Sequence, residues 1–77
     1  MSLEVIIKRS DFRLAKNGKN FLSLVFEDKS GQIPGKYWDA SEEDAKRFHV
    51  GAVVQLEGRR DVYQGKPQVN ITRLGLL

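Results

Sequence analysis

The sequence predicts an all-β protein: a five-stranded closed barrel with one short helix between the third and fourth strands. Five segments of strand length alternate apolar and polar residues, and turn signals rich in glycine, asparagine or aspartate separate them. Only one segment has the capping pattern of a helix. The chain has 77 residues and no cysteine, so one small domain must hold its core without disulfides, which favours a closed sheet.

The first two predicted strands form a hairpin. A β-branched run, Val5-Ile6-Ile7, begins a long strand from Glu4 to Leu14. Asn17-Gly18 then marks a tight turn, because both residue types tolerate positive φ. The second strand runs from Phe21 to Glu27. Its alternation predicts an inner face of Leu22, Leu24 and Phe26 and an outer face of Phe21, Ser23 and Val25.

A second tight turn, Asp28 to Gly31, leads into a third strand from Gln32 to Trp38. Pro34 cannot donate a ladder hydrogen bond, so the strand is expected to be an edge, bulged or interrupted there. Gly35 favours a sharp bend at the same place. Alternation predicts Ile33, Gly35 and Tyr37 on one face and Gln32, Pro34, Lys36 and Trp38 on the other.

The helix begins after Ser41, which is followed by three acidic residues in the first turn, and it should end before Gly51. Two more strands follow, Ala52 to Val62 and Gln68 to Leu74, joined by residues 63–67. The predicted barrel interior consists of Leu22, Leu24, Phe26, Ile33, Val54, Leu56, Val69 and Ile71.

This order of strands and helix is typical of the oligonucleotide/oligosaccharide-binding (OB) barrel, whose ligand face lies on strands two and three. The loops joining strands one and two and strands four and five flank that face. An SH3-like barrel is the alternative, but it has no helix at that point. We predict a single domain over residues 4–77, with residues 1–3 interpreted as a candidate expression-tag remnant.

Charge is unevenly distributed. The net charge is +3, but residues 39–48 hold four acids against two bases, a local net charge of −2, so the rest carries +5. Basic clusters interleaved with aromatics suit a polyanion such as nucleic acid; on charge alone, solubility is the competing explanation. The clusters are Lys8, Arg9, Arg13, Lys16 and Lys19; Lys36; and Arg59, Arg60, Lys66 and Arg73.

The sequence offers little for catalysis. Without cysteine there is no thiol chemistry, and the single histidine, His49, suits a structural or solvated role at the helix end. The acidic residues Asp39, Glu42, Glu43 and Asp44 are explained by helix-start chemistry better than by a magnesium site. We therefore expect no catalytic residue, metal or cofactor in this chain, and, with no signal peptide or spanning segment, a cytoplasmic location.

Three aromatic residues are candidates for contacting bases. Trp38 shares the outer face with Lys36, where its ring offers a stacking surface; the alternative is that it packs under the helix. Phe21 supplies a second stacking surface or closes the barrel end. Tyr63, before the Gln64-Gly65 tip, folds over the groove or packs on its own strand.

Basic residues near the expected ligand face are candidates for contacting phosphates. These are Arg13, Lys16, Lys19, Lys36 and Lys66. Arg59 and Arg60 are adjacent in a strand, so at most one of them should face the groove. Asn70 and Thr72 are interpreted as outward polar residues.

An ordered series of segments resembles one OB family. The segments are residues 17–24 (NGKNFLSL), 27–33 (EDKSGQI), 36–39 (KYWD), 54–58 (VQLEG) and 63–68 (YQGKPQ). From about residue 5 onward the chain resembles the N-terminal OB domain of YhaM-type 3′-to-5′ exoribonucleases of Gram-positive bacteria. More distantly it resembles the OB domains of replication protein A and of the tRNA-anticodon-binding group.

The resemblance implies a module that binds single-stranded RNA or DNA with low sequence specificity. In those enzymes an HD-type domain carries the catalysis, and this chain has no counterpart of it, so the implied partner is a nuclease domain in a longer parent protein. Lys16 and Lys19 match the family's basic loop, Trp38 its strand-three aromatic, and Tyr63 to Gln68 its tip between strands four and five. Pro34 departs from replication protein A, which tends to have a basic residue there.

A different class of function stays open from the sequence. An assembly or protein-interaction OB domain would bury the surface of Trp38, Phe21 and Val25 against a partner chain.

Overall fold

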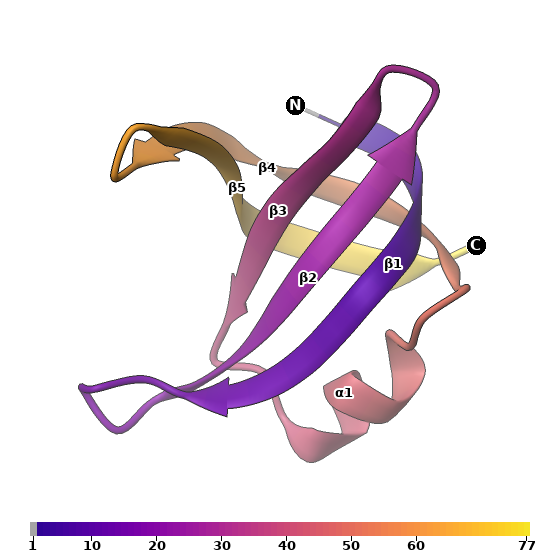
Figure 1. Cartoon of the computed structure of the whole chain (residues 1–77). Helices are drawn as coiled ribbons and strands as arrows, with labels where there is room; N and C mark the ends of the chain where they lie inside the picture. The colour runs from indigo at the N-terminus through magenta and orange to yellow at the C-terminus, as the bar shows by residue number, and fades with distance from the viewer. Residues whose placement is uncertain (1) are drawn as a thin grey trace.

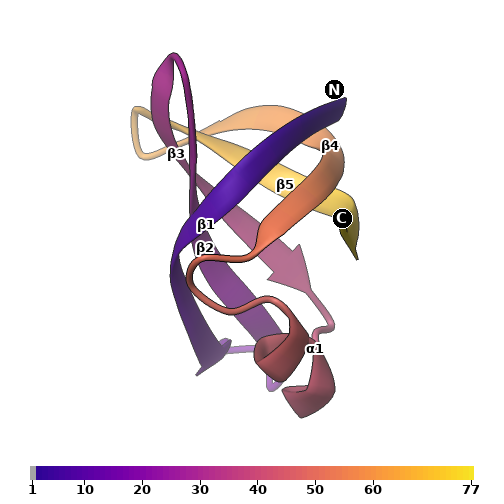
Figure 2. The same ribbon diagram turned by 90° about the vertical axis from the view of Figure 1, so that its right-hand side faces the viewer.

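A computed structural model describes residues 2–77, apart from the side chains of Ser2 and Tyr63. The elements are β1 (Ser2–Leu14), β2 (Asn20–Asp28), β3 (Gly31–Trp38), α1 (Glu42–Arg47), β4 (Val53–Tyr63) and β5 (Lys66–Leu76). The strands form a closed barrel in the order β1-β2-β3-β5-β4, with α1 across one end (Figures 1 and 2). The predicted fold class and element order are confirmed, and the fifth strand is longer than predicted at both ends.

Closure depends on a long first strand that changes partners. Residues 2–6 of β1 pair with β4, and residues 6–14 pair with β2. The register shifts between Ile7 and Arg9, which is the signature of a bulge. Because the extra residue reverses the alternation, Arg9, Asp11 and Arg13 pair with the outward residues of β2. The first strand therefore contributes charged side chains to the outer surface of the β1–β2 sheet.

Pro34 and Gly35 have separate explanations. The β2–β3 register runs through Pro34 without a shift, whereas β5 pairs only with residues 35–37, so Pro34 lies on an edge toward β5. Gly35 was expected to provide a bend; what the structure shows there is a close approach. A Cβ at Gly35 would lie 2.7 Å from Cε2 of the buried Phe26 ring, so only glycine fits beneath that ring.

The core fills the barrel as predicted. Seven of the eight predicted interior residues are buried, and Ile33 is half-buried against them. The core also includes Val5 and Ile7 of β1 and Phe48, which follows α1 and is 1% exposed. The ring of Phe48 meets that of Tyr37 edge-on, with centroids 6.1 Å apart. Phe48 thus closes the end of the barrel that α1 covers.

The helix is stabilised by its N-terminal cap, since none of its own residues is buried. The Ser41 Oγ accepts a hydrogen bond from the Asp44 N–H at 3.2 Å, and the Asp44 carboxylate accepts one from the Ser41 N–H at 3.0 Å. This capping box confirms the helix start predicted from the sequence. Within residues 2–77, α1 is neither long nor apolar enough to cross a membrane.

Candidate nucleic-acid interface

The outer face of β1, β2 and β3 is organised in cross-strand rows. At the end of the sheet near the β1–β2 turn, Arg13 lies opposite Phe21, and Phe21 lies opposite Trp38. Paired residues in neighbouring antiparallel strands project from the same face, so these three side chains form one row. This row brings together three of the residues singled out in the sequence.

Phe21 and Trp38 form an aromatic pair. Their ring centroids are 4.9 Å apart with an interplanar angle of 37°, and Trp38 is 39% exposed. Phe21 therefore lies beside Trp38 on the outer face instead of closing the barrel end. It is Tyr37, on the opposite face of β3, that contacts Phe48 next to the helix. We call Phe21 and Trp38 the aromatic platform.

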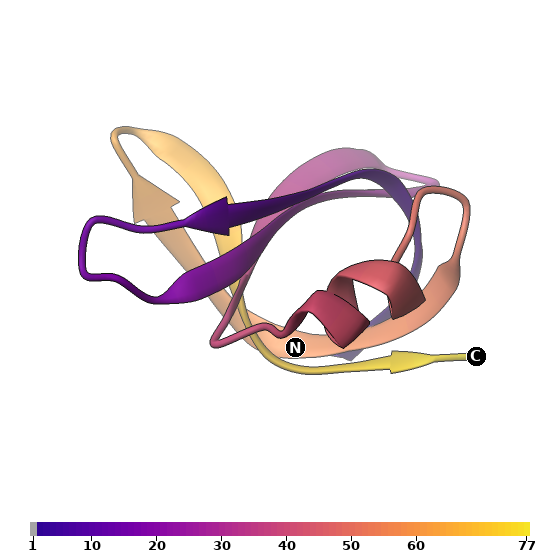
Figure 3. The same cartoon turned by 90° about the horizontal axis from the view of Figure 1, so that it is seen from below.

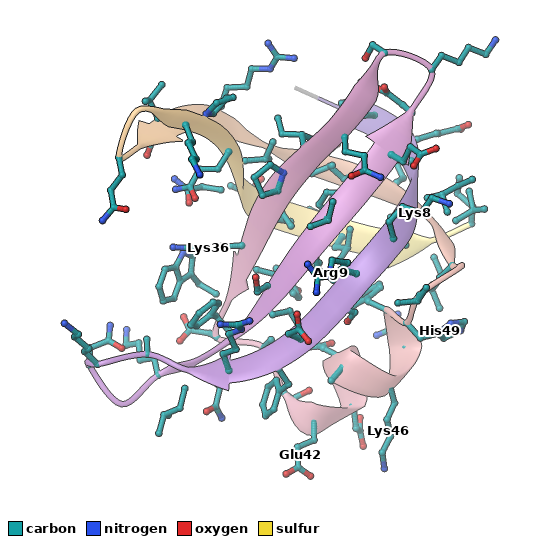
Figure 4. All side chains as sticks on the ribbon, viewed as in Figure 1. Lys8, Arg9, Lys36, Glu42, Lys46 and His49 are labelled. Carbon is teal, nitrogen blue, oxygen red and sulfur yellow. The ribbon has the colours of Figure 1, made fainter. Side chains whose placement is uncertain are left out.

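Lys36 lies over this platform. Its Nζ is 5.8 Å from the Phe21 centroid and 5.9 Å from the Trp38 centroid, within cation–π range of both rings. Figure 4 shows Lys36 at the edge of β3, on the side toward which both hairpins project. A cation held over two partly exposed rings combines a positive charge with an aromatic surface, the combination by which single-strand-binding proteins hold phosphates and bases.

The next row is polar and spans the whole face. Asp11, Ser23 and Lys36 are successive partners across β1, β2 and β3, and the row continues through β5 to β4 with Asn70 and Arg59. Arg60, by contrast, pairs with the buried Val69 and lines a pocket with Ile33 and Pro67. The register therefore places Arg59, and not Arg60, in the row with Lys36 and Asn70.

Two hairpins flank the face. The β1–β2 and β4–β5 hairpins project from the same side of the barrel (Figures 1 and 3). Lys16 and Lys19 are exposed in the first turn, and Lys66 is exposed at the start of β5, two residues before the half-buried Gln68. Tyr63 pairs through its backbone with Lys66; its side chain lies outside the described residues.

The turns explain how the hairpin tips are presented. In the first, the Gly18 N–H bonds to the Ala15 carbonyl and the Ala15 N–H to that of Lys19, with Gly18 at φ 81°. This is a three-residue loop with glycine in the left-handed position. In the second, Gln64 and Gly65 both have positive φ, 52° and 77°, as a two-residue type I′ turn requires. Both tips therefore have defined backbones that hold lysines at the rim.

The other end of the face, near the β2–β3 turn, carries charges of both signs. Glu27 accepts a hydrogen bond from Gln32 at 3.0 Å and lies 3.9 Å from the Lys8 Nζ. Hydrogen bonds from the Ser30 hydroxyl and N–H lower the pKa of Asp28, so this carboxyl stays ionised. This end of the face therefore combines acidic and basic side chains.

Glu42 and His49, which the sequence analysis assigned to the helix, lie away from this face. Figure 4 shows both at α1, together with Lys46 and apart from Lys36. His49 is exposed, with its Nδ1 3.0 Å from the Val50 carbonyl oxygen. Among the described residues no group of histidine and carboxylate side chains could hold a metal ion.

The register also adds residues that sequence reasoning did not place in the site. Arg9 lies on the outer face opposite Val25, one row beyond Asp11, and Ser23 lies beside Lys36. Arg9 could not be assigned to this face from alternation, because the bulge after Ile7 reverses it. Asn70 is outward, as predicted, and lies in the same row as Lys36.

A closed five-stranded barrel of this order, with its helix between β3 and β4 and an aromatic, basic outer face, defines an OB-type domain. The chain belongs to the tRNA anti-codon family, described as OB-fold nucleic acid binding domain, whose model matches residues 2–77. The predicted family resemblance is thereby confirmed.

Curated relatives are considerably longer than this chain. The 3′-5′ exoribonuclease YhaM of Listeria monocytogenes is 40% identical over 74 residues, covering 96% of this chain and 24% of that protein. YhaM of Halalkalibacterium halodurans is 39% identical over 66 residues, covering 86% of this chain and 21% of that protein. The chain thus spans about a quarter of the length of these exoribonucleases.

Solved structures share the fold at low sequence identity. The single-stranded-DNA-bound replication protein A heterotrimer contains a chain that matches with a TM-score of 0.77 and 17% identity, covering 99% of this chain and 55% of that one. The SSB domain of a Synechococcus protein matches with a TM-score of 0.82 and 19% identity, covering 96% of this chain and 90% of that one. These likenesses independently support the OB architecture.

Proposed function

We propose that this domain binds single-stranded RNA or DNA, with low sequence specificity, across β2 and β3. The observation that carries the proposal is the aromatic platform with Lys36 over it, between two hairpins with basic tips. Unpaired bases stack on the rings, and lysine and arginine side chains at the rim neutralise the phosphates. Bases inside a duplex are already stacked on one another and have no free face to offer.

Within the same proposal, the domain is the substrate-binding module of a 3′-5′ exoribonuclease and has no catalytic activity of its own. The name and greater length of the YhaM relatives support this role. A catalytic domain elsewhere in a longer parent chain cleaves the RNA, and this module holds the strand so that its 3′ end reaches that domain. The module needs no cofactor for binding and acts in the cytoplasm.

A titration with labelled single-stranded and duplex oligonucleotides at several salt concentrations tests the binding. We expect single strands to bind more tightly, and log K to fall with log salt at about −0.7 per phosphate neutralised. Trp38 is the only tryptophan, so its fluorescence should be quenched by single strands and much less by duplex. Equal binding of both forms, or binding insensitive to salt, contradicts the proposal; the second result would favour a protein-docking surface.

The first hairpin provides a test of the phosphate contacts. We expect the double variant Lys16→Ala/Lys19→Ala to bind single strands more weakly, with a salt slope shallower by up to about 1.4 because two contacts of about 0.7 each are lost. Both lysines are exposed in the β1–β2 turn, so the fold should be unaffected. The measurement is fluorescence anisotropy over a salt series.

The matched control removes the same charge elsewhere. Lys29, in the β2–β3 turn, and Lys46, on α1, are both exposed and lie off the face. Lys29→Ala/Lys46→Ala should leave the salt slope at the wild-type value. If both double variants change the slope equally, net charge and not the first hairpin governs binding.

A further inference from the structure

Asn70 lies in the polar row of the outer face, on β5. In β5 it pairs with Lys36 of β3 on one side and with Arg59 of β4 on the other, and it is half-buried. Lys36 is the residue whose ammonium group lies over the aromatic platform. Asn70 is therefore in the row next to the platform, where it can meet the edge of a base that stacks on the rings.

Asp61 fixes the orientation of the Asn70 amide. The Asn70 Nδ2 donates a hydrogen bond to the Asp61 Oδ2 at 3.1 Å. The other carboxylate oxygen, Oδ1, accepts the Val62 N–H at 2.8 Å, which holds Asp61 in place. An ionised carboxylate only accepts hydrogen bonds, so the amide nitrogen must be the atom that faces it. Flipping the amide would bring two acceptor oxygens together.

The consequence is a preset hydrogen-bonding edge on the binding face. With its nitrogen bonded to Asp61, the amide keeps its Oδ1 acceptor and a second N–H on the adjacent nitrogen for bonding a ligand. An acceptor next to a donor is the pattern that an asparagine side chain uses to recognise adenine, whose N6 amine donates while a neighbouring ring nitrogen accepts. Pre-orientation lowers the entropy lost when these bonds form.

We propose that Asn70 reads the exocyclic amine of the base that stacks on the aromatic platform, and so gives the domain a preference for adenine over a purine that lacks this amine. This inference rests on the proposed single-strand binding and refines it: most of the strand is held without regard to sequence, and one base is selected. Thr72 lies two residues further along β5, and its hydroxyl already donates a hydrogen bond to the Glu57 carbonyl at 3.1 Å, so that donor is not offered to a base. Thr72 therefore serves as the matched control.

The experiment must separate hydrogen bonding from stacking, because a purine stacks well whatever its edge. The probes are two single-stranded oligonucleotides of equal length, one of adenosine and one of purine riboside, which keeps the ring nitrogens and lacks the N6 amine. Affinities are measured by fluorescence anisotropy at one salt concentration. We expect the wild-type domain to bind the adenosine oligomer at least about fivefold more tightly, the lower end of what a bidentate amide–base contact gives.

Substitutions then assign the preference to its residue. In Asn70→Ala the ratio of the two affinities should fall to about one, with binding of the purine oligomer unchanged. Asp61→Ala should reduce the ratio because the amide is no longer oriented. This substitution also removes a negative charge, which changes the affinity for both oligomers, so the ratio of the two affinities is the quantity to compare. Thr72→Ala should keep the wild-type ratio. Circular dichroism checks that each variant is folded.

Two results would overturn the proposal while leaving single-strand binding intact: equal wild-type affinities for both oligomers, or a ratio that survives in Asn70→Ala. If neither oligomer binds with salt-dependent affinity, the proposed function fails and the adenine preference fails with it. The three outcomes are distinguishable in one set of titrations.

Discussion

Trp38→Ala is expected to bind single-stranded oligonucleotides about 1–3 kcal/mol more weakly than the wild type, the usual loss for one base–aromatic stack. Trp38 is half of the aromatic platform and lies outside the core, so the folded state should lose little beyond its contact with Phe21, worth about 0.5–1.5 kcal/mol. Titration of a labelled single strand gives the affinity, and thermal unfolding gives the stability.

Two further variants make this result specific. Trp38→Phe should retain most of the affinity, because a smaller ring still stacks. Val50→Ala removes an exposed apolar side chain that follows α1, and it should change neither affinity nor stability appreciably. A Trp38→Ala protein that loses about 3–5 kcal/mol of stability, as a core tryptophan would, but binds normally when folded would assign Trp38 to structure.

Gly58→Ala is expected to give the largest loss of stability from a single added methyl group. Gly58 follows a register shift in β4, and a Cβ there would lie 2.5 Å from the Asn70 carbonyl oxygen and 2.8 Å from Cγ1 of the buried Val69. Because the closest atom belongs to the backbone of the paired strand, a side-chain rotation cannot relieve the clash. We expect destabilisation of about 3 kcal/mol, the upper end of typical overpacking.

Gly75→Ala is the control for this substitution. Gly75 lies in β5 opposite Gln55, and a Cβ there would meet no atom within 4 Å. Its stability should stay within about 0.5 kcal/mol of the wild type. Urea denaturation monitored by Trp38 fluorescence compares the two variants. Equal effects at Gly58 and Gly75 would show that strand propensity, and not the close approach to β5, determines the cost.

The sequence predicted those parts of the fold that depend on one strand at a time. The alternation through Leu22, Leu24 and Phe26 was enough to define the core face of β2, and the Ser41 cap was enough to place α1. The parity of Trp38 with Lys36 was enough to put both on the outer face. These features are local, so a single sequence specifies them.

The remaining features depend on pairing between strands. The bulge after Ile7 turns Arg9 outward, and no residue type at that position predicts a bulge. Phe21 could be placed beside Trp38 only from the β2–β3 register. The contact between Asp61 and Asn70 joins different strands, so neither residue indicates it alone. The sequence thus indicated which aromatic and basic residues belong to the candidate site, but not how they are arranged in rows on the outer face.

The helix has a practical consequence for work with this domain. None of the six residues of α1 is buried, and the segment is anchored by the buried Ala40 before it and Phe48 after it. No strand pairing of the barrel passes through it. The exposed side of α1 is therefore a suitable place to graft a tag, a fluorophore or a reporter domain. Foreign sequence there interrupts no strand pairing and stays clear of the tips of both hairpins that flank the outer face (Figures 1 and 3).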